Sequence, residues 1–246
     1  MFQIFRKKRY LADLLEGFID IHNHILPGID DGAKNVAESV ALIKSFEALG
    51  VRHFIATPHI MHNYYPNNSE TIGHSLNLLK DELIKTGLSD ISISAAAEHM
   101  IDSNFEVILE KGEIMPIRKN YILIEMSYLQ ASINFNEAIF KIASARLFPI
   151  LAHPERYVYL KSGSRRFAKY KEQGMLFQLN LLSLGEFYGK DVQQKAFKLI
   201  DKGMIDFVAS DVHNMAQMQN LKEITIKRKL EQALLPIIER TIESFY

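Results

Sequence analysis

The chain has 246 residues, of which 48% are apolar, and it carries 29 basic and 29 acidic side chains. This length suits one large domain or two small ones, and an α/β barrel of about 250 residues forms a single domain. The balanced charge argues against a general nucleic-acid-binding protein. The absence of cysteine excludes disulfides, Cys-zinc sites and a thiol nucleophile.

The N-terminus is basic, with the run Arg6-Lys-Lys-Arg9. The apolar residues that follow are interrupted by Asp13 and Glu16, too soon for a signal peptide. No segment approaches the ~18 apolar residues of a transmembrane helix, so we expect no stable membrane insertion. We predict a solvated basic extension over residues 1–17 and a domain over 18–246; weak contact with an anionic membrane or partner is the alternative. The lack of cysteine fits a reducing compartment, and we expect a cytoplasmic protein.

Seven short segments rich in Ile, Val, Leu and Phe show little alternation, as in parallel strands covered on both faces. They are Phe18–His22, His53–Thr57, Ile91–Ala97, Tyr121–Glu125, Pro149–Ala152, Leu176–Asn180 and Phe207–Ser210. Helical patterns lie between them. The first begins at a capping Asn35 and stops at Gly50; the others are Glu70–Lys85, Asn134–Leu147, Arg165–Gln173, Asp191–Asp201 and Leu221–Leu235, the last before Pro236.

Alternating strands and helices indicate βαβ units and a parallel sheet. With seven predicted strands and no Gly/Ser-rich linker, the α/β pattern favours one closed or nearly closed TIM-like barrel. A doubly wound open sheet is the alternative.

Candidate metal ligands follow the ends of six of these strands. They are His22, His24, Asp31, His59, Glu98, Glu125, His153, Asp211 and His213. In a parallel barrel these strand ends meet on the face where active sites form. We therefore expect the nine side chains to line one cavity.

The spacing of the pairs supports a metal site. His22 and His24 are two residues apart on an extended segment, so both imidazoles point to one side, and Asp211 and His213 share that spacing. Each pair taken alone is equally consistent with a metal site and with two surface residues. The complete set of nine residues is not consistent with surface residues. Nine ligands exceed the needs of one ion, so we predict two or three. Imidazole and carboxylate without sulfur suit Mn, Fe or Zn.

Other polar residues have two interpretations each. Arg156 follows His153 closely and either binds a phosphate or carboxylate or forms a surface ion pair. His62, Asn63 and Tyr64 follow His59 and either meet the substrate at the rim of the site or form an ordinary loop.

Six motifs resemble, in order, those of the polymerase-and-histidinol-phosphatase (PHP) superfamily. They are Phe18-Ile-Asp-Ile-His-Asn-His-Ile-Leu-Pro-Gly-Ile-Asp-Asp-Gly32, Ala56-Thr-Pro-His59, Ala97-Glu98, Ile124-Glu-Met-Ser127, Ala152-His-Pro-Glu-Arg-Tyr157 and Ala209-Ser-Asp-Val-His-Asn214. The first is most similar to the manganese-dependent protein-tyrosine phosphatases of bacterial capsule and exopolysaccharide assembly. The resemblance covers about residues 18–235.

The resemblance implies a distorted (β/α)7 barrel of one domain and a trinuclear manganese site held by the nine residues above. Arg156 matches the arginine that binds phosphate in the family. The implied reaction is hydrolysis of phosphotyrosine by a metal-bridging hydroxide that attacks phosphorus in line. The implied partner is a phosphotyrosine protein, a bacterial tyrosine kinase with a tyrosine-rich tail.

Three other functions compete with this hypothesis. The first is a histidinol-phosphate or other small-molecule phosphatase. The second is a metal-dependent amidohydrolase, since such enzymes use similar His-x-His and Asp motifs. The third is a non-catalytic, metal-stabilised binding module. The oligomeric state is not predictable from the sequence.

Overall fold

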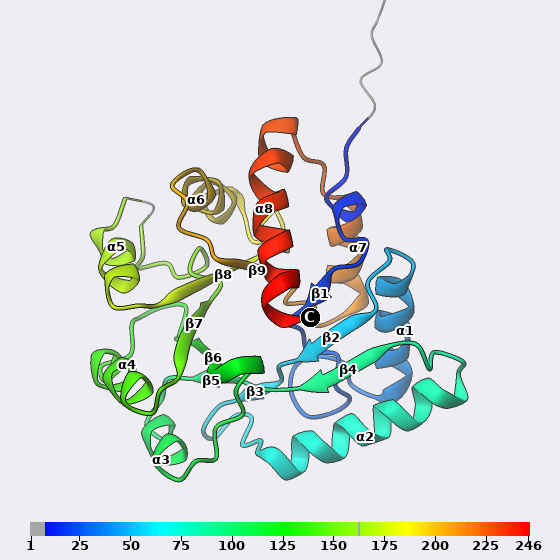
Figure 1. Cartoon of the computed structure of the whole chain (residues 1–246), viewed down its shortest axis with the longest axis horizontal. Coiled ribbons are helices and arrows are strands. Elements are labelled where there is room, and N and C mark those ends of the chain that lie inside the picture. The colour runs from blue at the N-terminus through cyan, green and yellow to red at the C-terminus, as the bar shows by residue number, and fades with distance from the viewer. Residues whose placement is uncertain (1–7, 162) are drawn as a thin grey trace, which may run out of the picture.

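The computed structural model describes residues 8–161 and 163–246, and its named strands form two parallel sheets (Figure 1). One has the order β1-β2-β4 and the other the order β3-β5-β6-β7-β8-β9. The strands are β1 (Ile19–Asp20), β2 (His53–Ala56), β3 (His59–Ile60), β4 (Ser92–Ala95), β5 (Glu98–Met100), β6 (Tyr121–Glu125), β7 (Phe148–Ala152), β8 (Leu176–Asn180) and β9 (Phe207–Ala209).

The two sheets are joined because two of the predicted strands continue after a short interruption. β2 leads through Thr57 and Pro58 into β3, and β4 leads through Ala96 and Ala97 into β5. Pro58 has no N–H group for a ladder, which accounts for the break between β2 and β3. The nine strands therefore occupy seven positions in two parallel sheets, which confirms the predicted parallel α/β fold with seven strand positions.

The first and last strand positions are held together beyond the regular ladders. The Asp211 N–H donates to the His22 carbonyl at 2.8 Å, and the His24 N–H donates to the Val212 carbonyl at 3.0 Å. The buried Asp20 carboxylate accepts hydrogen bonds from the Ser210 N–H at 2.9 Å and from its hydroxyl at 2.6 Å. These bonds bring the residues after β9 beside the residues after β1.

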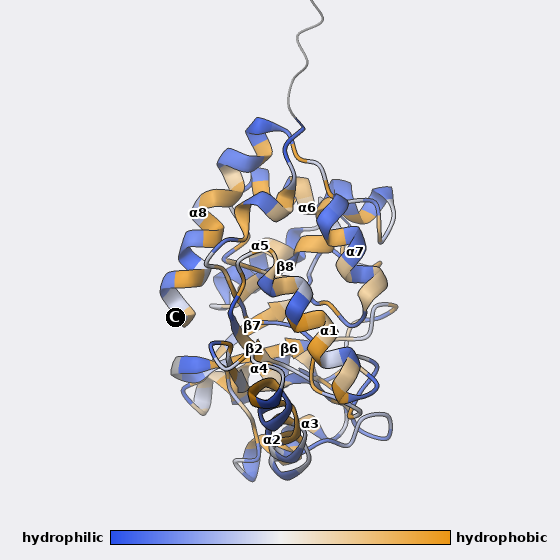
Figure 2. Ribbon diagram, turned by 90° about the vertical axis from the view of Figure 1, so that its right-hand side faces the viewer, coloured by the Kyte–Doolittle hydropathy of each residue, from blue (hydrophilic) through white to orange (hydrophobic). Residues whose placement is uncertain are grey.

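Helices surround the strands, as Figure 1 shows. They are α1 (Val36–Glu47), α2 (Ser69–Lys85), α3 (Phe105–Glu110), α4 (Phe135–Ser144), α5 (Arg165–Glu172), α6 (Lys190–Asp201), α7 (Met215–Glu223) and α8 (Arg228–Phe245). Asn35 caps α1 as predicted, because its side chain accepts from the Glu38 N–H at 3.0 Å. The inner strands are apolar while the helices carry both polar and apolar residues, as expected for one buried layer inside another (Figure 2).

The prediction of a last helix over Leu221–Leu235 is wrong. α7 ends at Glu223, and a short extended stretch separates it from α8, which continues through Pro236 to Phe245. A proline inside a helix removes one backbone hydrogen bond. α8 persists because its apolar face, including Ile238 and Phe245, is buried against the barrel.

The predicted extension over residues 1–17 is solvated only in part. Lys8 and Arg9 are exposed, as predicted, but Leu11 and Leu15 are fully buried in the main apolar core. The short helix η1 (Leu11–Leu14) carries the first of these side chains. The charge of the segment predicts exposure, whereas the apolar residues at positions 11 and 15 anchor it in the core. Arg6 and Lys7 lie outside the described residues.

Candidate metal centre

Strand register sets the centre of the site. His59 lies directly beside Glu98 in the pairing of β3 with β5, and Met100 lies beside Glu125 in the pairing of β5 with β6. Three polar side chains from adjacent strands thus emerge at one end of the sheet. Parallel strands place their carboxyl ends on the same face, which is why residues far apart in sequence meet here.

All nine candidate ligands lie in this one cluster. In the described residues, four groups have ligand atoms within 4.8 Å of one another. The groups are His24, Asp31, His59 and His213; His22, His24 and Asp211; His22, Glu98 and His153; and His59, Glu98 and Glu125. Several members recur, so the groups form one continuous cluster. Asp211 and His213 fall in different groups, although they share the i, i+2 spacing.

Glu98 is at the centre of the cluster. Its Oε2 lies 3.2 Å from His22 Nε2 and 3.2 Å from His59 Nδ1, and its Oε1 lies 3.0 Å from His153 Nε2. Burial alone would raise the pKa of Glu98, but the facing imidazoles hold it well below its ordinary range. A carboxylate with both oxygens directed at several imidazoles is suited to bridging cations.

Three histidines have one ring nitrogen engaged and the other directed into the cluster. His22 Nδ1 donates to Gln178 Oε1 at 2.8 Å, and His24 Nδ1 donates to Asp30 Oδ2 at 2.7 Å. His213 Nδ1 donates to the Asp211 carbonyl at 2.9 Å. A hydrogen bond at one nitrogen leaves the lone pair of the other for a metal ion, as in most protein metal sites.

His99 shows the opposite arrangement, although it follows Glu98 directly. Its Nδ1 donates to the Leu123 carbonyl at 3.1 Å, and its Nε2 accepts from the Met115 N–H at 3.2 Å. Burial lowers its pKa to about 4, so the ring stays neutral. With both nitrogens engaged, His99 acts as a structural residue.

The loop after β1 is folded tightly against His24. A Cβ at Gly32 would lie 2.0 Å from the His24 carbonyl oxygen, so only glycine fits. Asp30 Oδ1 accepts from the Gly32 N–H at 2.9 Å, and Asp30 Oδ2 accepts from the His59 N–H at 3.2 Å. This folding brings Asp31 Oδ1 to 3.4 Å from His59 Nε2.

The electrostatics of the cluster favour ionised carboxylates. Although Asp31 is partly buried, its hydrogen bond with His59 and the charge of His213 lower its pKa to about 2. Burial and the neighbouring His24 lower the pKa of His213 to about 4. The pKa of Asp211, like that of Glu98, is held well below its ordinary range despite burial, chiefly by His22 and His213.

The backbone is strained at two members of the cluster. His153 has φ of 35° and Asp211 has φ of 52°, both in the left-handed region that residues with a Cβ seldom adopt. His153 also precedes Pro154, a position that normally favours extended backbone. This strain is maintained by the surrounding packing, and it points both side chains toward Glu98 and His22.

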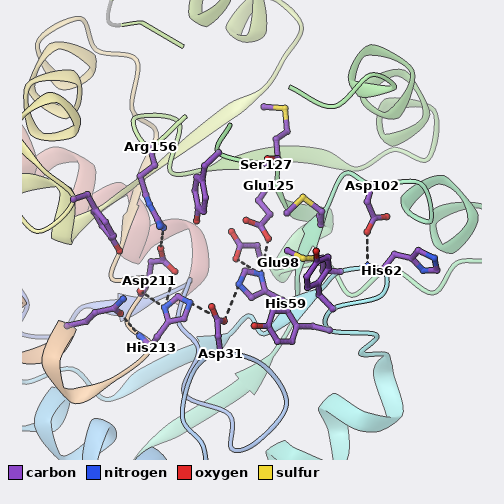
Figure 3. A pocket seen from close by; sticks show the side chains of 18 of the residues that line it. Asp31, His59, His62, Glu98, Asp102, Glu125, Ser127, Arg156, Asp211 and His213 are labelled. Carbon is purple, nitrogen blue, oxygen red and sulfur yellow. Dashed lines mark hydrogen bonds and ion pairs between the residues drawn. The ribbon is translucent and has the colours of Figure 1, made fainter. Parts of the chain in front are cut away.

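A cavity of about 600 Å³ opens above the cluster, and Arg156 lies in its wall (Figure 3). Arg156 NH1 donates to Asp211 Oδ2 at 2.7 Å. The guanidinium carbon lies 4.4 Å from the centre of the Tyr128 ring and 4.2 Å from that of Tyr188, so the cation is held between two aromatic faces. Arg156 is therefore not an ordinary surface ion pair.

Two of the three predicted rim residues line the cavity. His62 and Tyr64 line the cavity, whereas Asn63 is not among its lining residues. The His62 N–H donates to Asp102 Oδ2 at 2.7 Å, which fixes the loop after β3. Asn63 has φ of 66° and supplies the turn between its two neighbours.

The chemistry of the cluster fits divalent cations. Four buried atoms of candidate ligands in the described residues form no hydrogen bond: His59 Nδ1, Glu98 Oε2, Glu125 Oε1 and His153 Nδ1. The first of these faces two of the others, at 3.2 Å from Glu98 Oε2 and 2.9 Å from Glu125 Oε1. Leaving such atoms unpaired in the interior is costly, and a coordinated cation would satisfy those that face the cluster. The set of imidazoles and carboxylates is typical of Mn, Fe or Zn sites.

Sequence reasoning missed four residues that support the site. Asp30, Gln178, Tyr128 and Tyr188 contact a ligand or Arg156 directly. Asp30 had a visible signal, since it adjoins Asp31 in the same motif. Gln178 lies on predicted strand six, two residues before its end, and carried no signal of its own. The two tyrosines have no sequence relation to Arg156 that would reveal the contact.

Comparison with known proteins identifies relatives of similar length. CapC from Staphylococcus aureus is 31% identical over 87% of this chain and 84% of the relative. The tyrosine-protein phosphatase YwqE from Bacillus subtilis is 30% identical over 80% of this chain and 78% of the relative. A structure reported for YwqE and for CpsB from Streptococcus pneumoniae, described as metal-dependent tyrosine phosphatases, matches with a TM-score of 0.79 and 27% identity, covering 92% of this chain and 91% of that one.

More distant structures share the fold alone. The lactonase Lmo2620 from Listeria monocytogenes matches with a TM-score of 0.53 at 12% identity, over 98% of this chain and 96% of the other. The family model for capsular polysaccharide synthesis, CpsB/CapC, matches residues 18–236, nearly the whole barrel. From this match, and from relatives that retain the fold over most of their length, we conclude that the chain belongs to the CpsB/CapC family.

Proposed function

We propose that this protein is a metal-dependent phosphatase that hydrolyses phosphotyrosine in proteins. The observation that carries the proposal is the continuous cluster of nine imidazole and carboxylate ligands at the base of a cavity whose wall holds Arg156. The relatives named above as tyrosine-protein phosphatases support this substrate. Hydrolysis of a phosphate ester needs cations beside the phosphoryl oxygens and a nucleophilic water molecule. The arrangement of this cavity suits both requirements.

The metal ions would be held by the four groups of ligands described above. When bound, such ions neutralise phosphoryl oxygens and make water a stronger nucleophile at neutral pH. Glu98 would contact more than one ion, since both its oxygens face several imidazoles. Asp30 and Gln178 keep His24 and His22 in the tautomer that directs Nε2 into the cluster.

Arg156 would bind the phosphoryl group from the side. Its hydrogen bond to Asp211 and the rings of Tyr128 and Tyr188 fix the plane of the guanidinium. A fixed planar fork suits two oxygens of one phosphate and loses little freedom on binding.

The remaining wall of the cavity suits an aromatic ester. Met61, Met100 and Tyr65 are among its lining residues, together with Tyr64 at the mouth. Thioether and aromatic side chains make favourable contacts with a phenyl ring. This lining favours phosphotyrosine over a small cationic phosphate ester.

Manganese is our choice of metal, two or three ions for each chain. Sites that mix imidazole with carboxylate also accept iron and zinc. The identity of the metal is therefore decided by measuring activity with each ion. We further propose a phosphorylated bacterial tyrosine kinase as substrate, a role in capsule or exopolysaccharide synthesis, and a cytoplasmic location. The family's description supports the role in capsule synthesis.

The test measures metal content and hydrolysis on one purified batch. We expect a strong chelator to abolish hydrolysis of a phosphotyrosine peptide, and Mn²⁺ to restore it better than Fe²⁺ or Zn²⁺. Phosphoserine peptide, histidinol phosphate and an amide panel should be turned over at least tenfold more slowly. Full activity in protein shown to be free of metal would overturn the metal-dependent reaction, and preference for histidinol phosphate would overturn the protein substrate.

A further inference from the structure

A second surface forms where the N-terminal segment meets the start of α8. The Ile226 N–H donates to the Arg9 carbonyl at 3.0 Å, and Tyr10 forms an isolated antiparallel bridge with Thr225. This pairing joins residues more than 200 positions apart, and Figure 1 shows the two segments together at one end of the molecule. It creates an open depression of about 940 Å³ lined by five cations and one acidic residue, Asp13. The five cations form a basic patch that consists of Lys8, Arg9, Lys227, Arg228 and Lys229.

Ion pairs neutralise two of the five cations, and Asp13 offsets part of the remaining charge, which leaves a local positive surplus. Arg9 forms an ion pair with Glu231, and Lys229 Nζ lies 3.1 Å from Asp201 Oδ1. Lys8, Lys227 and Arg228 are exposed and form no ion pair within residues 8–161 and 163–246. The whole chain has a formal net charge of zero. The local excess of positive charge at the patch therefore reflects where the basic residues lie and not a basic composition of the chain.

The cations are placed where they oppose the stability of the fold. Lys227 is the N-cap of α8 and supplies no capping hydrogen bond, and Arg228 and Lys229 occupy the first turn together with one acidic residue, Glu231, which pairs with Arg9. Cations at a helix N-terminus are repelled by the helix dipole, and lysine cannot accept a hydrogen bond from the free N–H groups. The fold would tolerate acidic or small polar residues here better, so helix stability does not explain the basic residues.

An apolar groove adjoins the patch. Thr225, Ile226, Lys227 and Lys229 line both the basic depression and a neighbouring groove of about 390 Å³. The remaining residues of the groove include the apolar side chains Leu184, Phe197, Leu230 and Ala233. The surface therefore presents cations directly beside apolar side chains, a combination that matches an amphipathic ligand.

We propose that this patch binds the surface of an anionic phospholipid membrane. Phosphate headgroups would contact the basic residues, and the adjoining groove would accept apolar parts of the lipid. A nucleic acid would use the cations but not the apolar residues.

The contact is independent of the phosphatase site. None of the residues that line the patch or its groove lines the cavity with Arg156. Membrane attachment would therefore localise the protein without occupying its cavity. Because exposed charges are screened over about 8 Å at physiological salt, the contact should be weak, reversible and sensitive to ionic strength.

Vesicle co-sedimentation of the full chain tests this proposal. Vesicles contain phosphatidylcholine alone or mixed with phosphatidylglycerol. We expect binding only to the mixed vesicles, decreasing as salt is raised. The triple variant Lys8→Glu, Lys227→Glu, Arg228→Glu should bind at least 100-fold more weakly, since each cation near an anionic surface contributes about fivefold. A matched variant, Lys80→Glu, Lys111→Glu, Lys169→Glu, carries the same charge change elsewhere and should bind like the wild type.

Circular dichroism and thermal melting test whether the variants fold, independently of vesicle binding. The patch variant should retain the wild-type circular dichroism and melting temperature, because glutamate at the start of α8 suits the helix dipole. The matched variant is compared with it only after circular dichroism shows that it is folded. Wild-type binding no stronger to mixed than to neutral vesicles overturns the proposal, as does equal loss in both triple variants. Binding to a DNA duplex as tight as to mixed vesicles also overturns it, because the patch would then be a general polyanion surface.

Discussion

Arg156 and Asp211 connect the wall of the cavity to the cluster of candidate metal ligands. Asp211 Oδ2 accepts from Arg156 NH1 at 2.7 Å, while Asp211 Oδ1 lies 3.3 Å from His22 Nε2. One carboxylate thus orients the proposed phosphate-binding cation and faces the ligands at the same time. Asn180 Nδ2 also donates to Asp211 Oδ2, so the carboxylate retains a partner if Arg156 is changed.

The first prediction concerns Arg156. Arg156→Lys keeps the charge but loses the planar fork held between Tyr128 and Tyr188. We expect kcat/KM for a phosphotyrosine peptide to fall at least tenfold, a loss of about 1.4 kcal/mol in transition-state binding. Metal content should stay near that of the wild type because Asn180 still holds Asp211. The exposed Arg166→Lys is the matched control, and wild-type kcat/KM in both variants would contradict the assignment.

The second prediction concerns Asp30, which contacts ligands without being one of the nine. Asp30→Asn places an amide where the carboxylate now accepts from His24 Nδ1 and from the His59 N–H. We expect metal affinity to fall by about 10- to 100-fold, the usual cost of losing such a partner. Competition with a chromogenic chelator measures it. Asp102→Asn serves as control because Asp102 lines the same cavity but accepts only backbone bonds; equal effects of the two variants would refute the prediction.

The third prediction uses the tight contact at Gly32. A Cβ there would lie 2.0 Å from the His24 carbonyl oxygen and 2.6 Å from the His24 Cβ, so the loop must shift. We expect Gly32→Ala to lower both the melting temperature and the metal content. Gly73→Ala, on α2 with nothing within 4 Å, should instead stabilise by about 0.5–1 kcal/mol. A Gly32→Ala protein with wild-type metal content would show that the loop can relax freely.

The fourth prediction concerns pH and the buried Asp20. Burial raises its pKa to about 6, although Ser210 donates two hydrogen bonds to it. Because the folded pKa lies above the unfolded value, Asp20 stabilises the fold below about pH 4, and this contribution is lost as the pH rises through 6. Asp20→Asn stays neutral, so its stability relative to the wild type should increase between pH 4 and 7, by on the order of 3 kcal/mol.

Denaturant unfolding of both proteins in the same metal state measures this difference. Asp81→Asn, on the exposed face of α2, is the control and should show no such trend. A constant difference between Asp20→Asn and the wild type over this pH range would show that Asp20 is ionised in the fold throughout. Asparagine retains an acceptor for the Ser210 N–H, so the connection between β9 and β1 should survive.

The candidate ligands were predictable because of a property of parallel barrels. Polar residues that follow apolar strands must appear at the same face, whatever the length of the intervening helices. His59, Glu98 and Glu125 are examples, because each follows or ends a predicted strand. In the structure, register places His59 beside Glu98, and Glu125 beside Met100 of the strand that Glu98 begins. The ordered motifs also made the family recognisable.

Other features depended on long-range packing. The division of roles between Asp30 and Asp31 follows from how the loop folds over Gly32. The burial of Leu11 and Leu15 depends on a pairing with residues 224–226. The course of α8 through Pro236 depends on the apolar surface it covers. Local composition does not encode these partners.

Sequence alone thus determined the parallel order of strands and helices and the common face of the nine candidate ligands, since periodicity and strand ends are local properties. Only the tertiary structure decided which side chains surround Arg156, because Tyr128 and Tyr188 reach it from separate loops. It likewise assembled the basic patch from Lys8 and Lys227, which are 219 positions apart. Both arrangements arise because packing, not sequence distance, determines which exposed and half-buried side chains become neighbours.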